Sequence, residues 1–398
     1  MRQIILYVGN FDKPEISAAG KRVYNNSVVL EKLGYKIYMI GKIRNSANEN
    51  HTEINYGKNI SYIGFPKYKI IENNKYINFI KEFVAKNRLK PVAIIRYGHP
   101  SLALFDHLLT KYAHSINIPI IADIVDWLSV SNRNIFFKIV KSLDTYIDKT
   151  IFNKHVDGMI VISSYLDNYY SRIKIPRIII PPLANSYKLN SMINEYVTIT
   201  YAGTPFILGK RIKNKKAVKD RLDLAVLAIS ELIQKGNKVL FNIYGVSKSD
   251  FLIAYPDYQN VLLKAEDGIR FWGRKTMQDV QDAISNSDFS IILRERTRET
   301  MAGFSTKLVE SISCGTPVIT TDTSDTLKYV QDGINGFIIN IQNKNELERK
   351  LREIILLDKE KIREMKLNCF NKKEFLVDKF QTEFLDLFKK LLNDKNRM

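Results

Sequence analysis

The stretch that decides the fold is Ser290–Thr321, SIILRERTRETMAGFSTKLVESISCGTPVITT. Its start completes an apolar run, Phe289–Leu293, which is typical of a buried parallel strand. A polar, arginine-rich loop follows over Arg294–Gly303. The next segment predicts a helix over Phe304–Ser313, because its apolar residues recur on one helical face: Leu308, Val309 and Ile312.

A stop and a second strand complete this unit. Cys314–Pro317 ends the helix, and Val318–Thr320 begins another short strand. A βαβ unit of this kind binds its ligand at the carboxyl end of the strand, against the free N–H groups of the helix start. Ser305 or Thr306 can cap that helix, and Glu310 can accept hydrogen bonds from two hydroxyl groups. The pattern therefore suits the phosphates and ribose of a nucleotide.

The segment AGFSTKLVESISCGTPVI resembles the donor-binding segment of bacterial GT-B glycosyltransferases in the large retaining family 4. Many members carry two glutamates in this segment, and the second is implied to hold the nucleotide ribose. Glu310 matches that second position, whereas Ala302 stands at the first. Glu295 and Glu299 are nearby but do not fit the spacing.

The resemblance implies an α/β protein of the GT-B fold, with two Rossmann-like domains facing a central cleft. A length of 398 residues also favours two domains. We expect an acceptor-binding domain, a linker, a nucleotide-sugar-binding domain and a C-terminal helix that crosses back to the first domain, at 1–185, 186–196, 197–372 and 373–398. Helices are predicted near the end of the chain over Asn345–Leu357 and Lys373–Leu392.

Composition excludes several classes of protein. Hydrophobic residues make up 45% of the chain and aromatic residues 11%, which is ample for packed cores and excludes wholesale disorder. Its apolar runs are too short to span a bilayer. The start, MRQIILYVGNFD, predicts a first strand, not a signal peptide. Cys314 and Cys369 form neither a disulfide framework nor a metal-ligand pattern, so we expect a cytoplasmic protein.

The net charge is +19, and the excess lies mainly in the first half. Residues 1–190 carry 27 Lys and Arg against 14 Asp and Glu. This balance favours an anionic partner: a membrane surface, a lipid-phosphate acceptor or nucleic acid. A proteome rich in Lys, Asn and Ile, whose protein surfaces drift towards basic composition, would give the same balance.

The first predicted strand leads into the small-residue loop Ala18-Ala19-Gly20. By resemblance, this loop approaches the acceptor and the donor phosphates, which makes Gly20, Lys21 and Arg22 candidate acceptor-binding residues. Small residues here also permit close packing of a helix on a sheet, which is the alternative interpretation.

The acceptor site is implied near Asp123-Ile124-Val125-Asp126-Trp127, at the end of another predicted strand. Asp126 or Asp123 could orient an acceptor hydroxyl as a catalytic group, and Trp127 could stack on a sugar face. The alternative is that Asp126 caps the next segment and Trp127 is buried. His99, at the end of a third strand, is a weaker acceptor-binding candidate.

The second domain opens with a strand that ends at Gly203-Thr204, where the backbone can approach a diphosphate closely. A basic loop leads from there to Lys219-Asp220, which opens a helix. By resemblance, Lys219 contacts the leaving diphosphate. A run of charge of this kind is otherwise a solvated loop, and no partner of Lys219 can be chosen among Lys210, Arg211 and Lys213.

Together these features predict a glycosyltransferase that moves a sugar from a nucleotide-diphosphate sugar to a glycan or polyprenyl-diphosphate-linked acceptor. The resemblance implies retention at the anomeric carbon and a role in capsule, O-antigen or exopolysaccharide assembly at the inner membrane face. The chain has no Asp-x-Asp at a strand end, so neither a metal nor another cofactor is expected. Groups that could stabilise the leaving diphosphate are Lys219, Arg294, the amides of Gly203 and Thr204, and the helix start at Ser305, Thr306 and Lys307.

Three alternatives remain. A nucleotide-sugar epimerase or a phosphorylase of the same fold would carry other motifs, including a lysine that holds pyridoxal phosphate in the phosphorylase. A non-catalytic protein that binds sugar nucleotides or a membrane surface is compatible with Ala302 at the first glutamate position. Nucleic-acid binding lacks a basic–aromatic array and is the weakest of the three.

Overall fold

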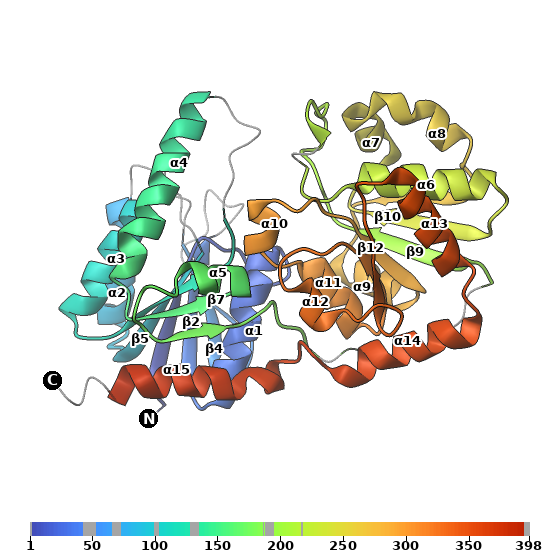
Figure 1. The fold of residues 1–398 in the computed structure, drawn as a ribbon. Helices are drawn as coiled ribbons and strands as arrows, with labels where there is room; N and C mark the ends of the chain where they lie inside the picture. The colour runs from blue at the N-terminus through green and yellow to red at the C-terminus, as the bar shows by residue number, and fades with distance from the viewer. Residues whose placement is uncertain are drawn as a thin grey trace. The chain divides into compact units, whose positions relative to one another are not determined.

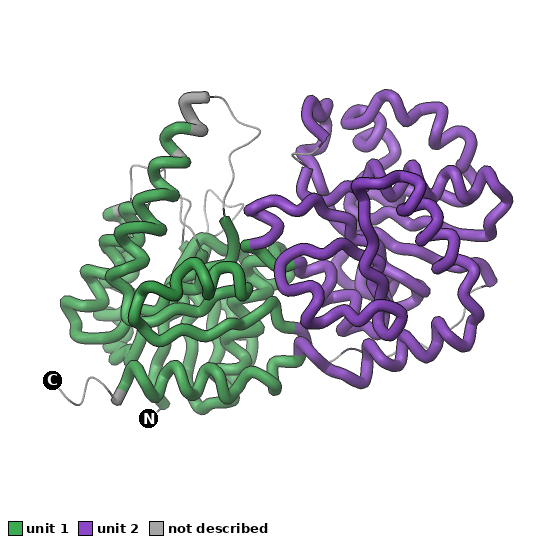
Figure 2. The backbone as a smooth tube through the Cα atoms, viewed as in Figure 1, with its two compact units in different colours: residues 1–183, 302–304, 376–398 green, residues 184–301, 305–375 purple. Residues whose placement is uncertain are grey.

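The computed structural model describes residues 2–42, 53–65, 73–98, 103–127, 135–185, 187, 195–215 and 218–393. The chain forms two compact units (Figure 2). The first comprises residues 1–183, 302–304 and 376–398, and the second comprises residues 184–301 and 305–375. Within the expected linker, residues 186 and 188–194 lie outside the described residues.

A sheet forms the centre of the first unit (Figure 1), and its order is β3-β4-β2-β1-β5-β6-β7-β8. The edge strand β3 pairs antiparallel with β4, and the neighbouring pairs of the other strands are parallel. Most of its strands are apolar runs because helices cover them. The strands are β1 (Ile4–Gly9), β2 (Lys36–Lys42), β3 (Glu53–Asn55), β4 (Ile60–Phe65), β5 (Pro91–Tyr97), β6 (Ile120–Ile124), β7 (Gly158–Val161) and β8 (Arg177–Ile179).

Helices surround this sheet and include the end of the chain. The C-terminal helix α15 places Phe384, Leu387 and Phe388 in the same apolar core as Tyr7 and Ile37. The helices of this unit are α1 (Ala18–Lys32), α2 (Asn73–Lys86), α3 (Ala103–Ser115), α4 (Ile135–Thr150), α5 (Ser164–Tyr169) and α15 (Gln381–Asn393), with 3₁₀ turns at Phe152–Lys154 and Val377–Phe380.

The second unit has a parallel sheet of order β11-β10-β9-β12-β13-β14. Its core lies between β9, β10 and β12 and helices α6, α7 and α13. The strands are β9 (Val197–Ala202), β10 (Val239–Tyr244), β11 (Ile269–Gly273), β12 (Phe289–Ile292), β13 (Val318–Thr320) and β14 (Gly336–Ile338).

The helices of the second unit alternate with these strands, so the strands run parallel. They are α6 (Leu222–Gln234), α7 (Lys248–Ala254), α8 (Gln259–Leu263), α9 (Met277–Ser285), α10 (Arg298–Ala302), α11 (Thr306–Ser313), α12 (Thr326–Tyr329), α13 (Lys344–Ile355) and α14 (Lys359–Lys372), with a 3₁₀ turn at Pro256–Tyr258. Although it closes α10, Ala302 belongs to the first unit.

The strand–loop–helix–strand prediction over Ser290–Thr321 is confirmed by β12, α11 and β13, with β12 and β13 parallel. Within its loop, Arg298–Ala302 forms a one-turn helix that the sequence did not predict. The prediction of one helix over Lys373–Leu392 is wrong at its start. Lys373 has φ 48°, a left-handed conformation that ends α14, and α15 begins at Gln381.

Candidate functional site

The carboxyl ends of β9, β10 and β12 form one edge of the second sheet, and Gly203 follows β9 there. A Cβ atom at Gly203 would lie 2.1 Å from Cε of Lys307, so the lysine side chain lies directly against the bare backbone of this glycine. The Gly203 N–H donates to the Tyr244 carbonyl at 2.9 Å. The prediction that this amide binds the diphosphate is therefore wrong, because its hydrogen is already used. Thr204, the next residue, is exposed, and its hydroxyl donates to the Gly245 carbonyl at 3.2 Å.

Beside Gly203 lies a buried carboxylate with two cations. Asp220 accepts hydrogen bonds from Arg294 Nε at 2.6 Å, Lys307 Nζ at 2.7 Å and the Tyr201 hydroxyl at 2.9 Å. Burial alone would raise the pKa of Asp220, but the charges of Arg294 and Lys307 outweigh it and hold that pKa well below its usual range. Asp220 is therefore ionised, and the group carries one positive charge in excess.

The two cations of this group differ in accessibility. The Arg294 side chain is 5% exposed, whereas that of Lys307 is 21% exposed. Lys307 is thus the cation that a solvent-borne anion can reach, and Arg294 holds Asp220 from the inside. Lys219, the lysine predicted to meet the diphosphate, is exposed beside Asp220 in the chain. Sequence reasoning missed Asp220, because only the lysine of Lys219-Asp220 was expected to meet the diphosphate and the aspartate was interpreted as part of a helix start.

A second ion-pair group supports this edge. Arg221 pairs with Asp223 at 2.9 Å and also with Glu295, while its N–H donates to the Leu293 carbonyl at 2.7 Å. Gln342 Nε2 donates to the other oxygen of Glu295 at 2.7 Å. Glu295 is thus engaged in holding the loop after β12.

Helix α11 starts at this edge, as the sequence predicts. Ser305 is its N-cap, with Oγ accepting from the Leu308 N–H at 3.4 Å. Three residues of the helix, Thr306, Lys307 and Glu310, are each only partly buried. Lys307 and Glu310 are three positions apart and so share a face. The helix therefore presents a cation and a carboxylate together, one turn apart.

Ala302, which stands where the resemblance expects the first glutamate, is not accessible to a ligand. The Ala302 side chain is fully buried, and its carbonyl accepts a hydrogen bond from the Ser163 hydroxyl at 2.6 Å. Both residues belong to the first unit.

In the first unit, Asp123 and Arg22 form a buried ion pair at 2.7 Å. Asp123 also accepts from the Tyr7 hydroxyl at 2.5 Å, and Arg22 donates to the carbonyls of Ile180 and Pro181 at 2.9 and 3.1 Å. Burial, followed by the charge of Asp123, raises the pKa of Tyr7 well above its usual value. The expectation that Asp123 is catalytic and that Arg22 binds acceptor is corrected here, because both side chains are enclosed and satisfy each other.

Gly20 fits the alternative interpretation, in which a small residue lets the helix pack closely against its surroundings. A Cβ atom there would lie 2.1 Å from the Asp12 carbonyl oxygen. With any larger residue, the start of α1 could not lie so close to the segment that contains Asp12. The neighbouring Lys21 is partly exposed. Gly20 therefore allows close packing and sets the position of Lys21.

The other acceptor candidates lie after β6. Asp126 and Trp127 are both partly buried. Trp127 meets the Tyr169 ring edge-on at a centroid distance of 4.8 Å, and Lys149 Nζ lies 3.5 Å from its ring centroid. These contacts fix the indole ring. His99 lies outside the described residues.

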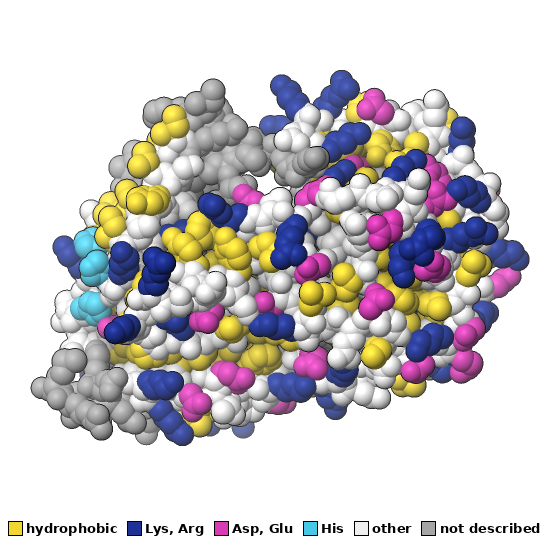
Figure 3. All heavy atoms as spheres, in the orientation of Figure 1, with side chains coloured by type: hydrophobic (Ala, Val, Ile, Leu, Met, Phe, Trp, Pro, Cys, Tyr) yellow, Lys and Arg dark blue, Asp and Glu magenta, His cyan; other side chains and the backbone are white. Residues whose placement is uncertain are grey.

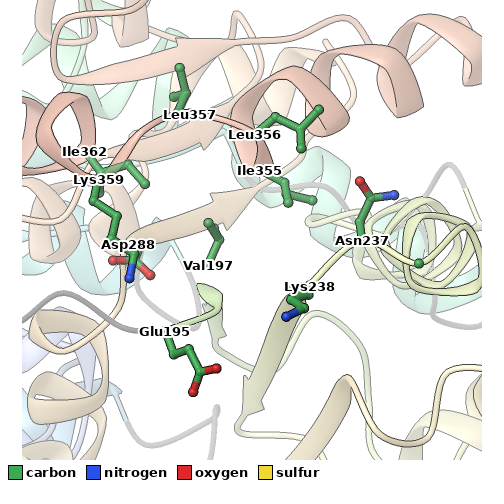
Figure 4. A pocket seen from close by; sticks show the side chains of 11 residues that line it. Glu195, Val197, Asn237, Lys238, Asp288, Ile355, Leu356, Leu357, Lys359 and Ile362 are labelled. Carbon is green, nitrogen blue, oxygen red and sulfur yellow. The ribbon is translucent and has the colours of Figure 1, made fainter.

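A pocket of about 420 Å³ lies elsewhere in the second unit, at the amino ends of β9 and β10 (Figure 4). Ile355, Leu356 and Leu357 form its apolar side, and its polar residues include Lys238 and Asp288. None of the predicted donor residues lines it, and parallel sheets bind ligands at the opposite, carboxyl edge. We therefore assign the site to the Gly203 edge. Among the described residues, no cluster of His, Cys, Asp or Glu could hold a metal ion, and no helix could cross a membrane.

Comparison with solved structures agrees with this architecture. Sucrose-phosphate synthase from Thermosynechococcus elongatus matches with TM-score 0.72 at 16% identity, covering 99% of this chain and 100% of that chain. Anabaena HepE in complex with UDP matches with TM-score 0.66 at 12% identity over 98% and 100%. TarM matches with TM-score 0.67 at 12% identity over 98% and 99%.

The chain has the GT-B glycosyltransferase fold. Residues 209–356 match the family described as glycosyl transferases group 1, and this match, together with the shared fold, indicates a transferase. The matched segment contains Asp220, Arg294, Lys307 and Glu310. No curated protein matches the chain.

Proposed function

We propose that this GT-B protein transfers a sugar from a nucleotide-diphosphate sugar to a glycan or lipid-linked oligosaccharide in surface polysaccharide assembly, with retention at the anomeric carbon. The observation that carries the proposal is the carboxylate Asp220 with two cations, one of which, Lys307, reaches over Gly203 beside the start of α11. An edge with one excess positive charge suits a departing nucleoside diphosphate.

The chain's own residues take distinct roles in this proposal. Lys307 and the exposed Lys219 neutralise the negative charge that develops on the diphosphate as the glycosidic bond breaks. Arg294, which the sequence suggested as a group for the diphosphate, is proposed instead to hold Asp220, which in turn orients Lys307, because the Arg294 side chain is only 5% exposed. Glu310 accepts hydrogen bonds from the ribose hydroxyls and contributes to binding more than to chemistry.

The acceptor is proposed to bind in the first unit. Asp126 and Trp127 remain the candidates there, since both are partly exposed while Asp123 is enclosed. Asp126 can orient an acceptor hydroxyl, and Trp127 can stack on a sugar ring. Lys21 is a further cation for the acceptor phosphate. A lipid-linked acceptor would place the protein in the cytoplasm, at the inner face of the membrane.

A uridine nucleotide is the first donor to test, because HepE binds UDP and UDP-glucose. No metal or other cofactor is included in the proposal. Thermal-shift measurements with UDP, GDP, ADP, CMP and their sugars should show stabilisation by one diphosphate family. The shift should be lost in Lys307→Met and Glu310→Ala, reduced in Lys219→Ala, and kept in Lys248→Met, whose exposed lysine pairs with Glu266. The absence of a shift with any nucleotide would refute the donor site.

Transfer itself needs a second assay. Sugar released from the preferred nucleotide should appear on a lipid-linked acceptor, with the anomeric configuration of the donor preserved in the product by NMR. Nucleotide binding without transfer or donor turnover would favour the non-catalytic binding protein, and interconversion of the nucleotide sugar without an acceptor would favour an epimerase.

A further inference from the structure

Helix α4 of the first unit is inverted relative to an ordinary surface helix. Such a helix turns its apolar residues inward and its charged residues to solvent. In α4, Thr145, Asp148 and Lys149 are buried, while apolar side chains are exposed. The cost of this arrangement in water implies that the outer face meets an apolar partner.

The inner face of α4 is held by specific polar contacts, so the inversion is a built feature. Asp144 accepts from the N–H of Ala103, at the start of α3, at 2.7 Å. Asp148 pairs with the buried Arg96 of β5 at 3.1 Å. Lys149 lies over the Trp127 ring. These contacts fix the rotation of α4 about its axis and keep its outer face outward.

The outer face is an apolar stripe. Ile139, Leu143 and Tyr146 lie at the spacing of one helical face, with 56%, 56% and 64% of their surface exposed, and Val140 beside them is 44% exposed. Figure 3 shows hydrophobic side chains gathered along this helix, bordered by histidine and by lysine or arginine side chains. The stripe is too short to cross a bilayer but suits a helix lying in its surface.

The charge around the stripe is positive. Lys111 of α3 and Lys154 after α4 are exposed. The carboxylates of the two helices are turned inward: Asp106 is fully buried against Arg96, and Asp144 and Asp148 make the contacts given above. The stripe is apolar, cations lie at its border, and the carboxylates of the two helices point inward. Such a surface is complementary to an anionic lipid surface.

We propose that α4 docks the first unit on an anionic phospholipid bilayer, with Ile139, Leu143 and Tyr146 inserted at the boundary between headgroups and acyl chains. The inference rests on the proposed function only in that a lipid-linked acceptor would be found there. It adds to the proposed function the element that binds the membrane.

Vesicle flotation tests the proposal with the full chain. Vesicles of phosphatidylcholine and phosphatidylglycerol in equal parts should bind the protein, vesicles of phosphatidylcholine alone should bind it less, and added salt should weaken binding. Leu143→Ser should reduce partitioning about tenfold, because the loss of one inserted leucine removes most of its transfer free energy. The matched control is Leu263→Ser on α8 of the second unit, where the leucine is 55% exposed, and its partitioning should be unchanged.

Insertion can be observed directly. The two cysteines, Cys314 and Cys369, are buried. A Leu143→Cys variant can therefore be labelled selectively with an environment-sensitive dye, whose emission should shift to the blue on the mixed vesicles. A Leu263→Cys variant labelled in the same way should show no shift.

Three outcomes would overturn the proposal: no binding to either vesicle, equal binding of Leu143→Ser and the unsubstituted protein, or a dimer in solution that Leu143→Ser dissociates. The last would make the stripe an interface between copies of this chain. The nucleotide thermal shift separates this proposal from the proposed function. It should be the same in Leu143→Ser and the unsubstituted protein, so loss of membrane binding with the shift intact is a failure of α4 alone.

Discussion

Each unit of the chain buries a tyrosine of its first strand against an aspartate and an arginine, but the two groups are closed to different degrees. In the first unit, Tyr7 and Arg22 enclose Asp123. In the second, Tyr201 and Arg294 hold Asp220, and Lys307 joins them from the partly exposed face of α11.

The difference is one cation. A single arginine neutralises Asp123, and the pair has no charge to offer a ligand. Asp220 has two cations, so one positive charge remains, and the lysine that carries it lies against Gly203 where the backbone is bare. The comparison teaches that a buried ion pair becomes an anion site when a second, reachable cation shares its carboxylate. Breaking either group separately tests this.

The largest effect is expected from Arg22→Met. It would leave the buried Asp123 without its cation, and the free energy of unfolding of the first unit should fall by about 3–5 kcal/mol. The chain has two tryptophans, Trp127 in the first unit and Trp272 in the second. Urea unfolding followed by Trp127 fluorescence, in a Trp272→Phe background, isolates the first unit.

The control for that variant is Lys32→Met, which breaks the exposed pair between Lys32 and Asp378 in the same unit. It should change the free energy of unfolding by less than about 1 kcal/mol. Equal losses in the two variants would contradict the structural role of Arg22.

The next effect belongs to the second unit and appears in catalysis. Lys307→Met removes the reachable cation, while Asp220 keeps Arg294 and Tyr201. We expect kcat/KM for the donor to fall about a hundredfold, or about 3 kcal/mol, with a much smaller change in the free energy of unfolding. Donor kinetics and urea unfolding followed by Trp272 measure the two quantities. Lys248→Met should leave both unchanged, and a large loss of stability in Lys307→Met without a kinetic defect would make Lys307 structural.

The sequence predicted the part of this site that follows from local patterns. The apolar run Phe289–Leu293, a cap at Ser305 or Thr306 and the Gly-Pro stop each depend on local sequence alone. Together they predicted β12, α11 and β13. Because parallel strands end at one edge of a sheet, the strand ends at Gly203 and Arg294 and the helix start at Lys307 are expected at that same edge.

The sequence could not predict which charges are buried together. Asp220 and Lys307 are 87 positions apart, and Arg22 and Asp123 are 101 apart. Asp123 looks catalytic because it ends a strand, and only the fold shows that an arginine from α1 closes over it. The sequence also does not show that the charged residues of α4 face inward. Asp148 points inward because it pairs with Arg96, which lies on β5.

The pH dependence of stability tests the group around Asp220 in the second unit. The folded pKa of Asp220 is held below its unfolded value of about 3.9. Its contribution to stability is therefore fully present above about pH 4 and is lost as the pH falls through the folded pKa. The difference in unfolding free energy between the unsubstituted protein and Asp220→Asn should be constant, at about 2–3 kcal/mol, near neutral pH and should shrink below about pH 4. Urea unfolding followed by Trp272 fluorescence, in a Trp127→Phe background, measures it.

The control for the acid series is Glu266→Gln, which breaks an exposed pair in the same unit. Its difference from the unsubstituted protein should stay under about 1 kcal/mol at every pH. A difference for Asp220→Asn that grows in acid would mean that the carboxyl is protonated in the folded state. The net charge that Asp220 forms with Arg294 and Lys307 would then differ from the single positive charge inferred above.

The smallest effects compare the two tyrosines. Tyr7→Phe and Tyr201→Phe each delete one hydroxyl donor to a buried carboxylate, and each should lower the unfolding free energy of its own unit by about 1–2 kcal/mol. Only Tyr201→Phe should also weaken donor binding, by about threefold, because Asp220 then draws Lys307 more tightly away from an incoming phosphate. Calorimetric titration with the preferred nucleotide measures the affinity. If Tyr7→Phe weakened it equally, the closed group of the first unit would be coupled to the donor site, and the distinction between a sealed ion pair and an open one would fail.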